Sequence, residues 1–463
     1  MKTALAIVLL VAACGGSPTP PPATLPSTGS TGADVSPMPP PPSDITSTTD
    51  GDVTDGTVAG IRVLVKRIPG AETASSRIYV LGGAMTWTKV TAGLEQLALS
   101  VAATGGTKQL DKDAFAKRLA DLGSTINASA SRDFSALTAW SLTPAWDDTF
   151  ALLAQVFREP ALPATQLDIE RRQQIAEIQH ELDDPDARLA ILVNEGMFKD
   201  HPYAIRPEGT LDTVASFTPD QVASQLQSLR QTSRMMVVVV GDIAPDRVLQ
   251  AVKRQLGDLP KGSYEPKPVP DPAAATAGQV EVTADKLPTN YIESEVLGPR
   301  WTDPDFPVAR VAMEWLANRE FEEVRTKRNL SYAPGAGYAW NSIVSTAWLY
   351  VTAVDPKATM KVMLDTVKQM RDGKISDHDL AAAKAMLLTN TYQESEAPAD
   401  QGSLLAHAQI FGGDWRLARG MTQLVDGVTA DQVQAWCAKH LTHFRTFVIG
   451  EASKIDRAPL ESF

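Results

Sequence analysis

The stretch Met235-Met236-Val237-Val238-Val239-Val240-Gly241-Asp242 is the clearest structural signal in this sequence. A short, continuous apolar run that ends in Gly-Asp is typical of a strand buried on both faces, and it is too short to span a membrane. The end of this pattern returns much later in the chain as Ile449-Gly450-Glu451. The repetition suggests that one structural unit occurs twice.

Two further pairs of segments recur at nearly the same offset. Leu122-Gly123-Ser124 is echoed by Leu330-Ser331-Tyr332, and Thr143-Pro144 is echoed by Asp355-Pro356. A near-constant offset across several anchors indicates an internal duplication. Each half reads as strands, then helices, then strands. We therefore expect an α+β fold of two homologous halves, each an antiparallel sheet with helices packed on one face.

Proline-rich segments divide the chain. Residues 14–56 are rich in Pro, Ser, Thr and Gly and predict a disordered tether, because they offer little apolar surface to bury. Residues 57–259 and 279–463 carry the globular pattern, and residues 260–278 predict a linker.

The N-terminus indicates export. Lys2 precedes a short apolar run that ends in Val11-Ala12-Ala13-Cys14-Gly15, which resembles a bacterial lipobox. We interpret residues 1–13 as a lipoprotein signal peptide and Cys14 as the lipidated residue, which anchors the protein in a membrane. An ordinary cleaved signal is the alternative. Because Gly15 is not the Asp of an inner-membrane retention signal, we expect a cell-envelope lipoprotein of the outer membrane that faces the periplasm.

Composition excludes one class of partner. The net charge is −12 and the Lys and Arg residues are scattered, which argues against a nucleic-acid ligand. The second of the two cysteines, Cys437, lies in a helical pattern and is expected to be a small buried side chain.

Four segments, in this order, resemble the insulinase/pitrilysin-type zinc peptidases, in particular the bacterial two-subunit type. They are Gly60 to Gly83, Gly93 to Thr107, His201-Pro202-Tyr203 and Phe321 to Tyr332. The resemblance implies that the two halves together form half of a clamshell. It also implies a zinc site built from a His-x-x-Glu-His helix and a Glu on a later helix, which leave one metal position for water.

The zinc helix of this chain lacks the donors. Counted back from Gly106-Thr107, the motif falls on Leu97 to Val101, and counted forward from Gly93 it falls on Gln96 to Ser100. Neither register places a His or a Glu at a motif position. The apolar residues form an i, i+3, i+4, i+7 stripe typical of a core-facing helix, namely Leu94, Leu97, Ala98 and Val101.

The later helix keeps acidic residues. By resemblance, Glu177 matches the third zinc ligand and Glu170 matches an assisting acidic residue on the same face. Without histidines we treat both as vestigial. The alternatives are a solvated or Arg-paired helix face, or a relict metal site that includes His180. His201 is expected to be structural, and the remaining histidines give no metal-ligand pattern.

The segment Phe321 to Tyr332 keeps an Arg and a Tyr at the family spacing. The resemblance implies that Arg325 and Tyr332 contact peptide near the scissile carbonyl, where both can donate hydrogen bonds. Alternatively, Arg325 pairs with Glu322 or Glu323 and Tyr332 packs in the core.

These features predict a non-catalytic subunit that binds unstructured peptides and completes the active site of a homologous, zinc-bearing partner. No cofactor is expected in this chain, with zinc in the partner only. A peptide-binding or scaffold pseudoprotease outside any peptidase complex is the second hypothesis. An autonomous peptidase with an unusual site is the third.

Overall fold

The computed structural model describes residues 45–463, all of which belong to one unit, Pro42–Phe463. Predictions on residues 1–44, including the signal peptide and Cys14, lie outside the described residues. The first sheet has the strand order β1-β2-β3-β7-β4-β6-β5. Its strands are β1 Ile45–Asp50, β2 Val53–Val58, β3 Ile61–Arg67, β4 Thr73–Leu81, β5 Thr125–Ala130, β6 Phe134–Leu142 and β7 Met235–Gly241.

The second sheet has the order β10-β11-β9-β12-β8. Its strands are β8 Gln279–Ala284, β9 Asn290–Gly298, β10 Gly335–Ala339, β11 Ser345–Ala353 and β12 Arg445–Gly450. This order repeats β5-β6-β4-β7-β3 of the first sheet, so the duplication predicted from the sequence is confirmed. The sheets are not purely antiparallel, since β3 pairs with β7, and β8 with β12, in parallel. In the sequence, the strands of each such pair are separated by three other strands of the same sheet and by several helices, so no tight turn joins them.

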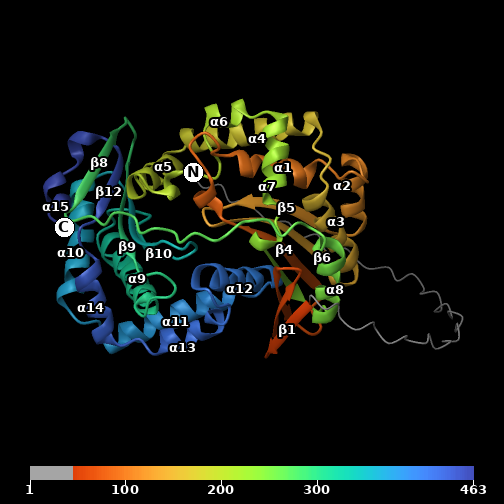
Figure 1. Cartoon of the computed structure of the whole chain (residues 1–463). Helices are drawn as coiled ribbons and strands as arrows, with labels where there is room; N and C mark the ends of the chain where they lie inside the picture. The colour runs from red at the N-terminus through yellow and green to blue at the C-terminus, as the bar shows by residue number, and fades with distance from the viewer. Residues whose placement is uncertain (1–44) are drawn as a thin grey trace, which may run out of the picture. The chain divides into compact units, whose positions relative to one another are not determined.

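Each half has its own set of helices, most of which lie on one face of its own sheet, as predicted, with α5 and α12 as exceptions (Figure 1). In the first half, residues 45–259, they are α1 Leu94–Thr104, α2 Lys112–Asp121, α3 Trp146–Arg158, α4 Ala164–Asp183, α5 Pro185–Met197, α6 Leu211–Ser216, α7 Pro219–Leu229 and α8 Pro245–Leu256. In the second half, residues 279–463, they are α9 Phe306–Glu320, α10 Pro356–Asp372, α11 Asp377–Gln393, α12 Pro398–Gly412, α13 Leu417–Asp426, α14 Ala430–His440 and α15 Arg457–Glu461. A π-helical segment, Phe321–Thr326, continues α9. None of the helices described is long and apolar enough to cross a membrane.

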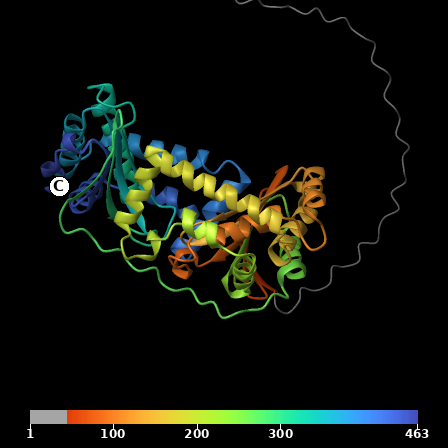
Figure 2. The same ribbon diagram turned by 90° about the horizontal axis from the view of Figure 1, so that it is seen from above.

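The other face of each sheet is covered by a helix of the opposite half. Helix α12 packs on β4 and β7, and α5 packs on β9 and β12 (Figure 1). Leu405 of α12 is buried against Val238 of β7. Leu189 of α5 shares a buried cluster with Phe447 of β12. Each half therefore completes the core of the other. Residues 260–278, all described, run between the halves as coil (Figure 2).

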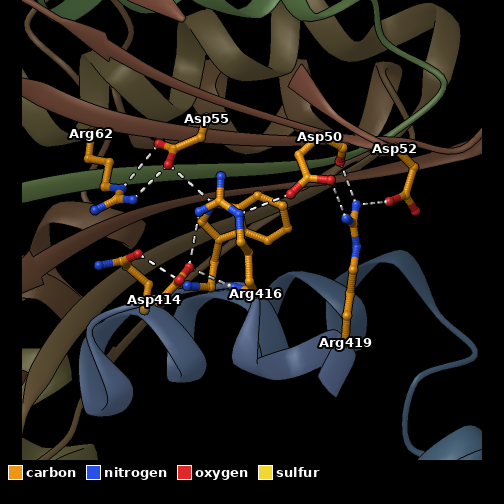
Figure 3. Close-up of polar contacts among 9 residues, drawn as sticks. Asp50, Asp52, Asp55, Arg62, Asp414, Arg416 and Arg419 are labelled. Atoms are coloured by element: carbon orange, nitrogen blue, oxygen red, sulfur yellow. Dashed lines mark hydrogen bonds and ion pairs between the residues drawn. The ribbon is translucent and has the colours of Figure 1, made fainter. Parts of the chain in front are cut away.

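The predicted tether is wrong at its C-terminal end, because residues 45–56 form β1 and most of β2 rather than a disordered segment. The polar Ser/Thr sequence of β1 concealed the strand, which is almost entirely exposed and is ordered by its ladder with β2. Ion pairs add to this order (Figure 3). Arg419 donates to Asp50 at 3.1 Å and also contacts Asp52, and Arg416 lies 2.9 Å from Asp50. The Arg416 hydrogen bond is the largest cause that lowers the pKa of Asp50.

Candidate functional site

The apolar stripe of α1 faces the core, as the sequence predicts. Leu97, Ala98 and Val101 are fully buried in the main cluster of the first half. Glu95, the acidic residue of α1, is also buried and is held by structural contacts. It accepts from the indole of Trp87 at 2.9 Å and from the hydroxyl of Ser135. This carboxylate belongs to the core and is not available to a ligand.

The opposite face of α1 carries neutral polar side chains. Gln96 donates to the hydroxyl of Ser100 at 3.0 Å, and its carbonyl oxygen accepts from the backbone amide of Ala130 at 2.7 Å. Gln96 and Ser100 are partly exposed, whereas Leu97 and Val101 are not. The register counted forward from Gly93 therefore places the histidine positions of the motif on the solvent-facing side of α1. An amide and a hydroxyl in mutual contact are a poor substitute for two imidazoles.

Helix α4 brings one of its two candidate carboxylates to α1. Glu170 accepts from the hydroxyl of Thr104 and from the side-chain amide of Gln166, both at 2.8 Å. Glu177 is exposed and makes no hydrogen bond or ion pair within residues 45–463, and His180 is exposed as well. Neither acidic residue is paired with arginine in this helix.

The donor set does not fit zinc. No group of three or more His, Cys, Asp or Glu side chains within the described chain is arranged to hold a metal ion. Thr104 and Gln166 instead satisfy Glu170 without a cation. No chemical step at a metal can therefore be derived for this helix pair.

Arg325 and Tyr332 lie together on the surface of the second half. The guanidinium carbon of Arg325 is 4.0 Å from the centroid of the Tyr332 ring and 4.9 Å from that of Phe321. Tyr332 is 78% exposed, so the alternative that it packs in the core is wrong. A cation close to two aromatic rings is stabilised by attraction to their π systems. We call Phe321, Arg325 and Tyr332 the arginine stack.

The carboxylates next to the arginine stack are engaged by other cations. Glu323 accepts from Lys327 at 2.7 Å and from Arg328 at 2.5 Å, and these bonds lower its pKa. Glu322 lies 2.9 Å from Lys327. Arg325 itself forms no ion pair within residues 45–463, which contradicts the alternative of local pairing with Glu322 or Glu323.

The family-like tripeptide at His201 is structural. His201 accepts from the amide of Tyr203 at 3.1 Å, and Tyr203 is fully buried. The Tyr203 hydroxyl donates to Asp133, whose other oxygen accepts from the amide of Ile343 in the second half at 3.2 Å. Burial raises the pKa of Asp133. This link between the halves was missed in the sequence, because a lone Asp in a turn gives no signal of a distant partner.

A polar pocket of about 370 Å³ lies beside this link. Its lining comes from α4, α5, the turn between β5 and β6, and the segment at Asn341. Arg132 donates to Asn194 there, and Arg206 pairs with Glu181. The sequence did not single out these residues. Cys437, in contrast, is a fully buried free thiol whose pKa burial raises to about 12, as predicted for a core side chain.

The comparisons with known proteins agree with the fold. Residues 62–210 match the family model "Insulinase (Peptidase family M16)", and residues 216–387 match "Peptidase M16 inactive domain". The chain is 22% identical to the mitochondrial-processing peptidase subunit beta of Saccharomyces cerevisiae over 85% of this chain and 89% of that protein. It is 25% identical to mouse cytochrome b-c1 complex subunit 1, over 47% of this chain and 45% of that protein.

Among solved structures, a peptidase M16 inactive domain from Pseudomonas fluorescens is similar, with a TM-score of 0.77 at 18% identity. The alignment covers 88% of this chain and 98% of that one. It shows a shared fold over nearly all of the described residues.

Proposed function

The chain belongs to the insulinase family, peptidase family M16, and from this premise we propose that it is a non-catalytic, peptide-contacting subunit. It would pair with a homologous zinc-bearing peptidase chain and complete that partner's active site. The observation that carries the proposal is a contrast within one molecule. The helix that binds zinc in active relatives offers Gln96 and Ser100. The arginine stack, in contrast, has two exposed rings, and its cation has no carboxylate partner within residues 45–463.

The chemistry of the arginine stack suits a peptide carbonyl. A guanidinium donates up to five hydrogen bonds, and the phenol of Tyr332 adds one more. Donors of this kind stabilise negative charge that develops on an oxygen. The rings of Phe321 and Tyr332 hold the guanidinium without neutralising its charge. The stack therefore fits a role in binding extended, unstructured peptide at a site whose metal is supplied in trans.

We further propose that Cys14, outside the described residues, is lipidated and anchors the protein in the outer membrane on its periplasmic side. The support is the lipobox-like sequence alone. Labelling with a radioactive fatty acid in the native bacterium tests this anchor. Incorporation that is lost in Cys14→Ser supports lipidation, and equal labelling of both chains overturns it.

Reconstitution tests the peptidase role. The pure protein is expected to leave an unstructured peptide uncut and to hold no stoichiometric zinc. Addition of the zinc-bearing homologue from the same genome should restore cleavage. Arg325→Ala should then lower the rate by about 10- to 1000-fold, the range seen on removal of an oxyanion donor.

Arg328→Ala is the matched control, because it removes a cation from the same segment that is already paired with Glu323. It should leave cleavage within about twofold, since surface pairs contribute little. Full activity of the Arg325→Ala complex would refute the role of the stack. A tightly bound, stoichiometric zinc in the pure protein would refute the proposal as a whole.

A scaffold protein is the second candidate, favoured by the similarity to a subunit of the cytochrome b-c1 complex. The two candidate functions predict different neighbouring genes and different binding of peptide. A scaffold needs no neighbouring gene for a zinc-bearing homologue, and it should not bind unstructured peptides through Arg325. Fluorescence anisotropy of a labelled peptide, compared between the natural chain and Arg325→Ala, separates them.

A further inference from the structure

The internal duplication exposes a difference between the halves. In the first half α8 follows β7, packs against α3, β2 and β3, and buries Val248, Val252 and Leu256. The corresponding position after β12 is taken by α15, which has five residues and buries only Leu460. Helix α10 is the counterpart of α3, because each follows the second strand of its hairpin. The space that α8 fills in the first half is therefore only partly filled in the second.

A pocket of about 350 Å³ occupies this space and is lined by residues of α10, of β9 and of the segment at α15. Figure 1 shows α10 and α15 beside the second sheet. Its walls are apolar and well buried. Ile292 of β9 is 1% exposed, and Met360 and Leu364 of α10 are almost as buried. Pro459, Leu460 and Phe463 close the other side. A cavity of this size and polarity is typical of a small-molecule site.

The rim of the pocket is positively charged on balance. Three lysines of α10 line it, Lys357, Lys361 and Lys368, against two aspartates, Asp365 and Asp456. Lys357 lies 3.3 Å from Asp456, and Lys361 lies 2.6 Å from Asp365.

The third lysine differs from the other two. The ammonium group of Lys368 makes no ion pair or hydrogen bond within the described part of the chain. The main-chain oxygen of Phe463 accepts from the amide of His443 at 2.6 Å and from the hydroxyl of Thr442 at 3.2 Å. Within residues 45–463, Lys368 is thus a cation at the mouth of an apolar pocket that pairs with no carboxylate.

We infer that this α10–α15 pocket binds a medium-chain fatty acid. The aliphatic tail would lie between Met360, Leu364 and Leu460, and the carboxylate would meet Lys368 at the rim. Apolar walls alone would accept any hydrophobic molecule, but the unpaired ammonium selects an anion among them. A neutral or cationic amphiphile of the same length would leave Lys368 without a partner or repel it.

Calorimetric titration of the purified chain tests the site with sodium octanoate, sodium decanoate and decanol. Decanoate should bind roughly tenfold more tightly than octanoate, because two more methylenes are buried. Decanoate should also bind several-fold more tightly than decanol. Decyltrimethylammonium should bind more weakly than either.

Three variants locate the ligand. Leu364→Trp fills the pocket and should abolish decanoate binding. Lys368→Ala should weaken decanoate several-fold and leave decanol unchanged. Lys89→Ala removes an exposed lysine of the first half, far from this pocket in the sequence, and should change nothing. Leu460→Trp fills the pocket from the α15 side and replaces Leu364→Trp if thermal melting shows that the latter is unfolded.

The inference is overturned if decanoate fails to bind below its micellar concentration. It is equally overturned if decanoate and decyltrimethylammonium bind alike. Decanoate binding that survives both tryptophan variants in folded protein would place the ligand elsewhere and refute the site. None of these outcomes depends on a peptidase partner.

Discussion

Replacement of Trp415 offers a quantitative test of how the second half is joined to the first. Trp415 lies between α12 and α13 and is fully buried among residues of the first sheet, including Leu64 and Val238. Its indole N–H donates to Asp55 of β2 at 3.1 Å. The guanidinium of Arg416 stacks on the ring at 4.7 Å. One side chain therefore combines apolar burial and a hydrogen bond across the two halves with a cation–π contact to its neighbour in the chain.

The magnitude follows from these contacts. Truncation of a buried Trp to Ala typically costs about 3–5 kcal/mol, since the cavity adds to the lost burial. Trp415→Phe keeps most of the ring and loses the hydrogen bond to the Asp55 carboxylate, which costs about 1.5–3 kcal/mol. Trp140 of β6 is 39% exposed, so Trp140→Ala should cost about 1 kcal/mol or less.

Urea denaturation followed by circular dichroism measures the free energy of unfolding of these variants. Hydrogen exchange measured by mass spectrometry shows which segments lose stability in each variant. Trp415→Ala should lose amide protection first in α12 and α13, because these helices lie on the first sheet through this residue. If Trp415→Ala destabilises the protein no more than Trp140→Ala, the buried contact does not join the halves energetically and the reasoning is wrong.

Three further predictions concern titration and metal. Burial raises the pKa of Glu293 to about 7. The stability contributed by its protonated form is therefore present below about pH 4.3 and is lost as pH rises through 7. In Glu293→Gln, the free energies of unfolding measured with urea at pH 5 and at pH 8 should differ less than in the natural chain. Burial lowers the pKa of His407 to about 4. The stability contributed by its neutral form is therefore present above about pH 6.5 and is lost as pH falls through 4. Between pH 6.5 and pH 4, the melting temperature of His407→Phe should fall less than that of the natural chain. The double variant Gln96→His/Ser100→His places two imidazoles on the partly exposed face of α1. It should bind zinc in an amount that atomic absorption can measure. Zinc at background level would refute the register counted forward from Gly93.

Local patterns predicted those parts of the fold that depend on local sequence. The apolar run at Met235 forms β7, which is buried on both faces, and the stripe of α1 faces the core. The repeated anchors predicted the duplication because each marks the end or the start of an equivalent strand. In every case the burial of a residue is set by neighbours close in the sequence or by a regular period.

Features built from distant segments could not be predicted in this way. The sequence of α12 does not reveal that Leu405 packs on β7, because an apolar helix face can be buried against any other apolar surface. The hairpin of β1 was interpreted as tether since its strand is stabilised by pairing and by Arg416 and Arg419 rather than by apolar burial. The register of the degenerate zinc helix also needed the structure, where exposure distinguishes Gln96 from Leu97.

The side chains at the two candidate sites are satisfied to different degrees. At the zinc helix, Gln96 bonds Ser100, and on the neighbouring helix Glu170 is satisfied by Thr104. Glu177 is exposed and has no partner within residues 45–463. At the arginine stack, Arg325 has no ion pair within residues 45–463 and lies close to the rings of Phe321 and Tyr332, which are both exposed. A guanidinium in this state keeps its hydrogen-bond donors for a ligand, as the proposed contact with peptide requires.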